Sequence, residues 1–210
     1  MSETSAPMPP ETPPPLLRFA RAVDATIRLI GELVSWLSLA MVLVTFLVVV
    51  LRYAFDSGSI ALQESVTYLH ATLFMLAIAY TLGRNGHVRV DIFYQRMGPR
   101  ARAWVDLVGT LVLLIPVCVL ILWLGWRSVG DSWAVREGSR EAGGLAGVYL
   151  LKTLILLMPA LLLLQGLAWV ARSALFLSGR ADALAEEVGG VLPGRNRASP
   201  KTSDGGAGDA

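Results

Sequence analysis

Two side chains that can carry or exchange a proton lie in the otherwise apolar stretch LQESVTYLHATLFMLAIAY, residues 62–80. They are Glu64 and His70. A carboxylate in an apolar segment can couple an ion to transport, and an imidazole can ligate haem. On a straight α-helix, positions six residues apart point about 120° away from each other, so the two groups do not form one site. Glu64 and His70 are therefore expected to have separate roles.

Glu64 lies within about one turn of the polar edge of this stretch, where water and a helix N-terminus both favour an acid. An acid deep in a bilayer would indicate a functional site, whereas one at the edge does not. Two roles stay open for Glu64. We favour a contact at the membrane surface or with another subunit over an ion-coupling carboxylate.

The histidine and cysteine content disfavours cofactor chemistry. The chain has two histidines, and the second, His87, lies outside the apolar runs, so a haem-carrying electron-transfer anchor is disfavoured. The single cysteine, Cys118, excludes an intrachain disulfide and a thiolate metal site. We predict that His70 hydrogen-bonds a neighbouring helix, with Thr67 assisting.

The last apolar run contains further polar groups. Lys152 lies about two turns into it, where it either reaches the outer surface by snorkelling or meets a charge on a second protein. Gln165 adds an amide further along the same run. Pro116 and Pro159 are predicted to kink two different runs, because proline removes a backbone donor.

The segments that position these groups are four apolar runs, at about residues 33–51, 65–82, 107–126 and 145–171. The composition is 54% hydrophobic, and a bilayer is crossed by about 20 apolar residues in a helix. The predicted fold is an all-α integral membrane protein with four transmembrane helices. Arginine is concentrated before the first run, between the second and third, and after the fourth, which predicts that both termini are cytoplasmic.

The segments outside the runs are also patterned. Apolar residues recur at helical spacing before the first run, which indicates either an amphipathic interfacial helix or an extension of the first span. They are Leu16, Phe19, Val23, Ile27 and Ile30. Residues 1–15, without a signal peptide, and residues 178–210 are predicted to be disordered tails around a membrane domain of residues 16–177. Two short loops, about 52–63 and 127–144, are predicted to face outward. The basic segment 83–106 is predicted to lie on anionic lipid headgroups.

Several stretches carry a family resemblance. They are LRYAF, ALQES, YLHATLFMLAIAYTLGRNGHVRVDIFY, SWAVREGSREAGGL and LLKTLILLMPALLLLQGLA. These stretches, taken together with their order and spacing, cover about residues 20–180. Over this range the sequence resembles the small, DctQ-like membrane subunit of tripartite ATP-independent periplasmic (TRAP) transporters. The resemblance implies a non-enzymatic protein of the bacterial inner membrane that braces a large membrane subunit. That partner imports a solute, often an organic acid, with sodium, after a periplasmic protein has captured it.

The resemblance also implies which residues matter. Substrate and sodium sites belong to the large subunit, so no catalytic, substrate, cofactor or metal residue is assigned here, and with a net charge of +2 no nucleic-acid partner is expected. The candidates for subunit contact or structure are Arg52, Glu64, His70, His87, Asp91, Ser132, Trp133, Glu137, Lys152 and Gln165; Gly86 and Val88 also fall on recurring family positions. The family often has an acidic pair where this chain has Gln63–Glu64. The alternative hypothesis is a self-sufficient small proton-coupled exporter that uses Glu64.

Overall fold

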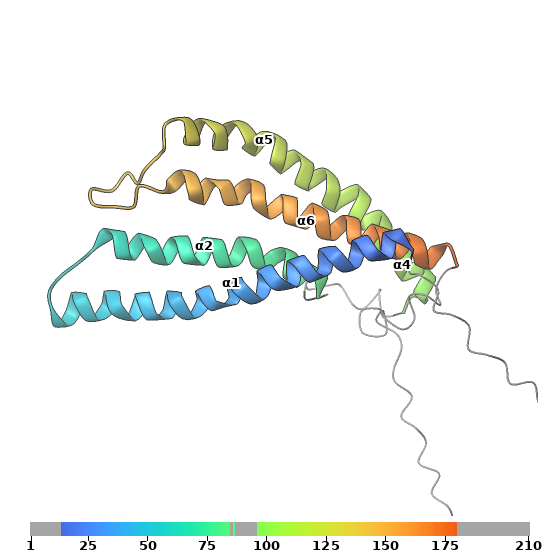
Figure 1. Cartoon of the computed structure of the whole chain (residues 1–210), viewed down its shortest axis with the longest axis horizontal. Coiled ribbons are helices and arrows are strands. Elements are labelled where there is room, and N and C mark those ends of the chain that lie inside the picture. The colour runs from blue at the N-terminus through green and yellow to red at the C-terminus, as the bar shows by residue number, and fades with distance from the viewer. Residues whose placement is uncertain (1–13, 85, 87–95, 180–210) are drawn as a thin grey trace, which may run out of the picture.

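The computed structural model describes residues 14–84, 86 and 96–179, which are helical apart from short connections. The elements are α1 Pro15–Ala54, α2 Ile60–Gly83, α4 Pro99–Gly109, the π-helical turn η1 Thr110–Leu114, α5 Ile115–Ala134 and α6 Val148–Leu177. Because α4, η1 and α5 follow one another without a break, the described chain consists of four long helical rods (Figure 1). All four are long and apolar enough to cross a membrane, as the sequence predicts.

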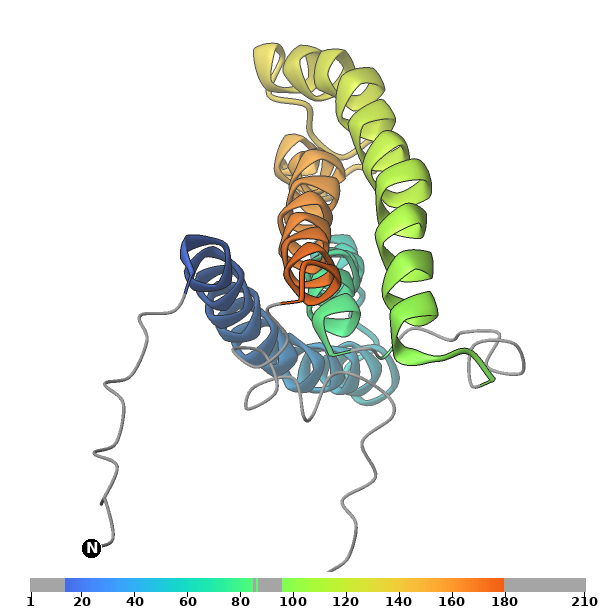
Figure 2. The same cartoon turned by 90° about the vertical axis from the view of Figure 1, so that its right-hand side faces the viewer.

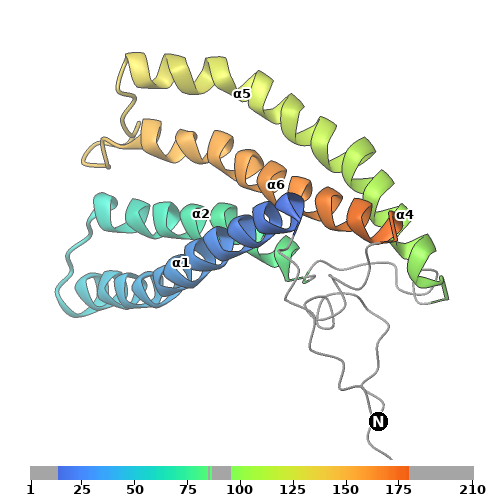
Figure 3. The ribbon, with the colours of Figure 1, turned by 45° about the vertical axis from the view of Figure 1, so that its right-hand side comes forward.

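Helix α6 is the inner element of the fold. It packs against α1, α2, α4 and α5, and α2 in turn lies beside α1 (Figures 1 and 3). In the most apolar stretch of α6, 39% of the residues are buried, compared with 6% in α1, 6% in α2 and 11% in the α4–α5 rod. Most apolar side chains therefore face outward, where a lipid bilayer or a partner protein covers them.

The first helix decides between the two alternatives for the N-terminal segment. Residues 15–54 form one continuous helix, so the segment is an extension of the first span. Its buried side chains pack in the protein, with Leu17 against Leu175 and with Val23 and Ile27 in the cluster around α6. The alternative of a separate interfacial helix before the first span was therefore wrong. The buried face is also displaced from the predicted one, since Leu16 and Phe19 remain largely exposed.

The third span is longer than its apolar run because polar residues at both ends continue the helix. The sequence predicts residues 107–126, whereas the rod runs from Pro99 to Ala134. Ahead of Pro116 the backbone widens into the π-turn η1, a common response to a missing backbone donor. A Cβ atom on Gly166 of α6 would lie 2.8 Å from the Leu114 side chain, so glycine at that position allows the turn to approach. Pro159, by contrast, lies within an unbroken α6.

Candidate functional site

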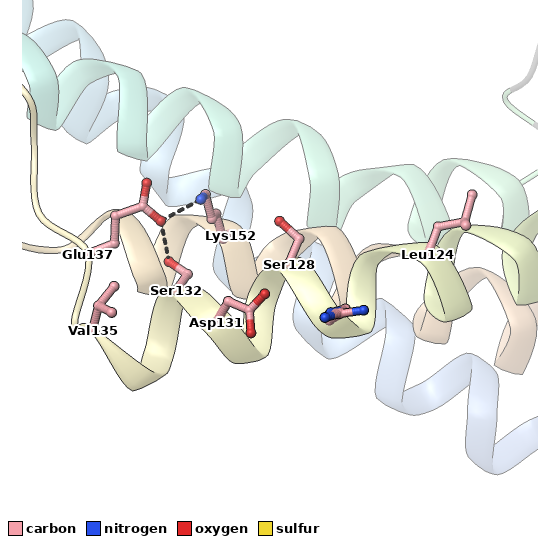
Figure 4. A pocket seen from close by; sticks show the side chains of 8 residues that line it. Leu124, Ser128, Asp131, Ser132, Val135, Glu137 and Lys152 are labelled. Carbon is pink, nitrogen blue, oxygen red and sulfur yellow. Dashed lines mark hydrogen bonds and ion pairs between the residues drawn. The ribbon is translucent and has the colours of Figure 1, made fainter.

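The connection between α5 and α6 is held by an ion pair between its first residues and the start of α6. Glu137 accepts a hydrogen bond from the hydroxyl of Ser132, at 2.7 Å, and pairs with the ammonium of Lys152 (Figure 4). Ser132 belongs to the last turns of α5 and Lys152 to the first turns of α6. The lysine charge in the fourth span is therefore neutralised within the chain.

The hydrogen bond from Lys152, followed by that from Ser132, lowers the pKa of Glu137 from its ordinary value of 4.5. The carboxylate is consequently ionised at neutral pH and holds the ammonium as a charge pair. The Lys152 and Glu137 side chains are 31% and 30% exposed, so water screens part of this attraction.

Trp133 provides a second brace between the same helices. Its indole Nε1 donates to the Thr153 hydroxyl oxygen at 2.9 Å, and its ring meets Tyr149 edge to face with centroids 4.8 Å apart. Both partners lie in the first two turns of α6. Trp133, a candidate for subunit contact or structure, thus joins α5 to α6.

Glu64 binds the same loop from the other side. One carboxylate oxygen accepts from the Ser139 hydroxyl and the other from the Leu145 backbone N–H at 2.6 Å. Glu64 lies in the first turns of α2, which Ser59 caps through a hydrogen bond to the Leu62 N–H. Glu64, the carboxylate in the apolar segment, therefore joins α2 to the α5–α6 connection.

Glycine makes this approach possible. A Cβ atom on Gly144 would lie 2.8 Å from Oε1 of Glu64 and would also collide with Ser139. The preceding Gly143 has φ +83°, a left-handed conformation that favours glycine. The Gly pair thus lets the loop fold back onto the carboxylate.

A second polar group ties α1 to α6 at the opposite end of the rods. Asp24 accepts from the Gln165 amide nitrogen at 3.0 Å and pairs with the guanidinium of Arg172. Gln165 is fully buried, and a Cβ atom on Gly83 of α2 would lie 2.9 Å from its amide nitrogen. Three helices therefore meet around this amide.

Sequence reasoning missed Asp24 and Arg172. Asp24 is one of the charged residues between the apolar positions of the amphipathic segment. It nevertheless lies four residues after Ala20 and three before Ile27, which puts it on their buried face. This spacing in the sequence could have identified Asp24 as a residue of the buried face. Nothing in the sequence marked Arg172 as its partner.

The other candidates lie apart from these clusters. His70 and Thr67 are both exposed, and the His70 ring stacks on Phe74 of its own helix with centroids 6.2 Å apart. His70 thus meets no other helix of the described chain, and a contact with another subunit stays a prediction. Arg52 is exposed at the end of α1. His87, Val88 and Asp91 lie outside the described residues, whereas the Gly86 N–H bonds the Thr81 carbonyl at 2.9 Å.

An open hollow of about 530 Å³ lies beside the Glu137–Lys152 pair, lined also by Arg127, Ser128 and Asp131 of α5 (Figure 4). The hollow is lined by both basic and acidic side chains. Within the described residues, no group of three or more His, Cys, Asp or Glu side chains could hold a metal ion. The arrangement is suited to holding helices and a loop in place.

The fold and these tethers define a small multi-pass helical membrane protein. Residues 41–176 match the family model of the tripartite ATP-independent periplasmic transporters, DctQ component, and the chain belongs to this family. The family model describes one component of a membrane transporter. A Haemophilus influenzae protein assigned as a TRAP transporter small permease protein is 34% identical over 93 residues. That match covers 44% of this chain and 56% of the relative. No solved structure gives a significant match.

Proposed function

We propose that this chain is the bracing subunit of a sodium-coupled importer of an organic acid or related solute. It works with a large membrane subunit, which carries the solute and sodium sites, and with a periplasmic binding protein. It lies in the inner membrane with both termini in the cytoplasm, the side on which arginine is concentrated.

The observation that carries the proposal is the small buried share of three of the four rods. Only 6% of the most apolar stretches of α1 and α2, and 11% of that of the α4–α5 rod, is buried in the chain. Exposed apolar residues such as Trp36, Phe46 and Trp123 leave ample surface for a second membrane protein. A bracing subunit needs such a surface, because helices in a bilayer associate by packing rather than by hydrophobic burial.

The polar groups are also consistent with bracing. Glu64, Lys152 and Asp24 are each bonded to partners from other segments of this chain. Glu64 has a hydrogen-bond donor on each oxygen, which suits a fixed tether better than a carboxylate that repeatedly gains and loses a proton. The geometry thus favours bracing over the proton-coupled exporter.

The test is co-purification followed by transport. The chain, tagged at its C-terminus, is extracted from native membranes in mild detergent, and the proteins that accompany it are identified by mass. A large polytopic membrane protein in near-equal amount is expected. Liposomes containing the chain alone should not take up solute, whereas the complete system should do so with sodium. Uptake or export by the chain alone would refute the proposal.

A further inference from the structure

A second hollow, of about 510 Å³, opens between α1, α2 and α6 at the end of the rods where α1 begins and α6 ends. Figure 2, which looks at the molecule from this end, shows the end of α2 close to the last turns of α6, with the first turns of α1 to one side of them. The hollow lies where α2 ends at Gly83 and where charged residues of α1, Asp24 and Arg28, precede its uncharged run. It is therefore at the depth of lipid headgroups rather than of acyl chains.

The rim of the hollow is strongly basic. Arg21 and Arg28 of α1 and Arg84 at the end of α2 line it, and all three are exposed. Arg84 lies over the Tyr80 ring, 5.2 Å from its centroid, which holds the guanidinium at the rim. Among the described residues, Arg28 makes a long contact of 4.0 Å with Glu32, both side chains being largely exposed. Guanidinium groups of this kind suit a phosphate.

The floor of the hollow has the opposite character. The fully buried Gln165 lines it, and the amide oxygen of Gln165 has no hydrogen-bond partner among the described residues. Asp24 accepts from the amide nitrogen of Gln165 and from Arg172, so the amide oxygen of Gln165 faces away from Asp24. A buried acceptor without a donor costs about 1–3 kcal/mol. The floor therefore calls for an N–H or O–H donor. Asp24 already pairs with Arg172, but each of its oxygens keeps a lone pair that a cationic donor can also reach.

A ligand that satisfies both rim and floor carries a phosphate and a primary ammonium. Ethanolamine phospholipids combine these groups in one headgroup. A choline headgroup has no N–H to donate, and a glycerol headgroup has no positive charge. Basic pockets between transmembrane helices are suited to binding phospholipid headgroups.

We propose that this hollow binds the headgroup of an ethanolamine phospholipid from the adjacent leaflet, which is the inner leaflet in the proposed orientation. The arginines at the rim hold the phosphate, and the Gln165 oxygen beside Asp24 accepts from the ammonium. The bound lipid thereby fills the gap between α1, α2 and α6. This assignment concerns the chain's own residues and does not depend on the transported solute.

The test is lipid retention by the full-length protein in mild detergent, measured by native mass spectrometry. The protein is offered equal amounts of phosphatidylethanolamine, phosphatidylcholine and phosphatidylglycerol with the same acyl chains. Retention of phosphatidylethanolamine is expected to exceed that of the other two by about tenfold, the effect of one hydrogen bond to a charged group. Equal retention of the three lipids would overturn the proposal.

Variants separate rim from floor. Arg84→Gln should lower the retention of all three phospholipids, because they share the phosphate. Gln165→Leu should abolish the preference for phosphatidylethanolamine over phosphatidylcholine. Arg100→Gln is the matched control, since Arg100 is an exposed arginine near the start of α4, away from the hollow, and should change nothing. Arg84 is exposed, so its replacement tests the rim even if Gln165→Leu disturbs folding. Unchanged lipid retention in a folded Arg84→Gln variant would overturn the assignment.

A soluble solute is distinguished by titrating phosphoethanolamine or inorganic phosphate and following thermal unfolding. We expect neither to stabilise the protein as phosphatidylethanolamine does. Stabilisation by either solute without a preference among the three lipids would assign the hollow to a soluble phosphate compound and overturn the lipid proposal.

Discussion

At the scale of single residues, the clearest lesson concerns Lys152. An ammonium in a spanning helix costs about 2.5–3.5 kcal/mol at the bilayer centre, yet here it lies in the first turns of α6 and meets Glu137. Both sequence alternatives, snorkelling and pairing with a second protein, left out a partner from the adjoining loop. The pair also fixes how the loop leaves α5.

A double-mutant cycle tests this pair. Glu137→Gln should lower the thermal stability of the protein, because it leaves the Lys152 charge unpaired. Lys152→Met should do likewise by leaving Glu137 unpaired, and the double variant should recover much of the loss. Unfolding in detergent, followed by circular dichroism, measures the three changes. Strictly additive losses would mean that the two side chains do not interact.

The ion pair also predicts a dependence on pH. The pKa of Glu137 is lowered in the folded protein, so its stabilising contribution is complete above the ordinary value of 4.5 and is lost as the pH falls through the folded value. The difference in melting temperature between the native protein and Glu137→Gln should therefore be present at neutral pH and shrink below about 4.5. Glu64, which binds the same loop, is present in both proteins and cancels. A difference that grows in acid would contradict the assignment.

Gly144 offers a sharp test of the Glu64 tether. Gly144→Ala should destabilise the protein by about 1–3 kcal/mol, because its methyl group collides with Ser139 and Glu64. Gly138→Ala is the matched control, since its nearest neighbour would be in ordinary contact at 3.5 Å. Thermal unfolding and protease cleavage of the loop provide the readouts. Equal behaviour of the two variants would mean that the Glu64 contact does not constrain the loop.

At the scale of helices, the sequence predicts the number and approximate position of the spans because long apolar runs have no other satisfactory state in lipid. It predicts their ends less well. Helix α5 continues through Arg127, Ser128 and Asp131 because a helix already formed extends through polar residues. The site was predicted only as separate residues: Glu137 and Lys152 were candidates, but their pairing depends on how the loop turns.

The extension of α1 illustrates a second limit of what the sequence can predict. Its amphipathic pattern fits a lipid surface and a protein surface equally well, and only the tertiary structure shows that Leu17, Val23 and Ile27 pack in the protein. Asp24 is the polar member of that interface. Local periodicity therefore gave the segment its helical form without identifying the surface that it meets.

Removing Asp24 tests this interface. Asp24→Ala leaves the Gln165 amide nitrogen and the Arg172 guanidinium without their partner, which should cost about 1–3 kcal/mol. Backbone hydrogen exchange in residues 15–30 should rise, because the extension separates from α6 more often. Glu32→Ala, which removes an exposed acid of the same helix, should leave exchange unchanged. Equal protection in both variants would show that Asp24 does not hold the extension.

At the scale of the whole molecule, a chain that buries so little of three rods is suited to association. Its own contacts lie mainly along α6, while the second half of α1, after Val34, has no buried residue. The polar tethers at the two ends of the rods fix their relative positions without filling the space between them. This geometry leaves a wide apolar surface exposed on a chain that has little core of its own.

Replacement of Glu64 tests bracing in the assembled transporter. Glu64→Gln keeps one acceptor for the two loop donors and replaces the other acceptor with an amide donor, so uptake by the complete system should fall by about fivefold, equivalent to roughly 1 kcal/mol. The sodium dependence and the pH dependence of uptake should stay as in the native system, because Glu64 holds a loop. The measurement is solute uptake into liposomes at several external pH values, with Gln63→Ala, an exposed neighbour, as the control. Loss of a proton-driven flux that the purified chain supports by itself would instead make Glu64 a proton carrier and the protein a transporter in its own right.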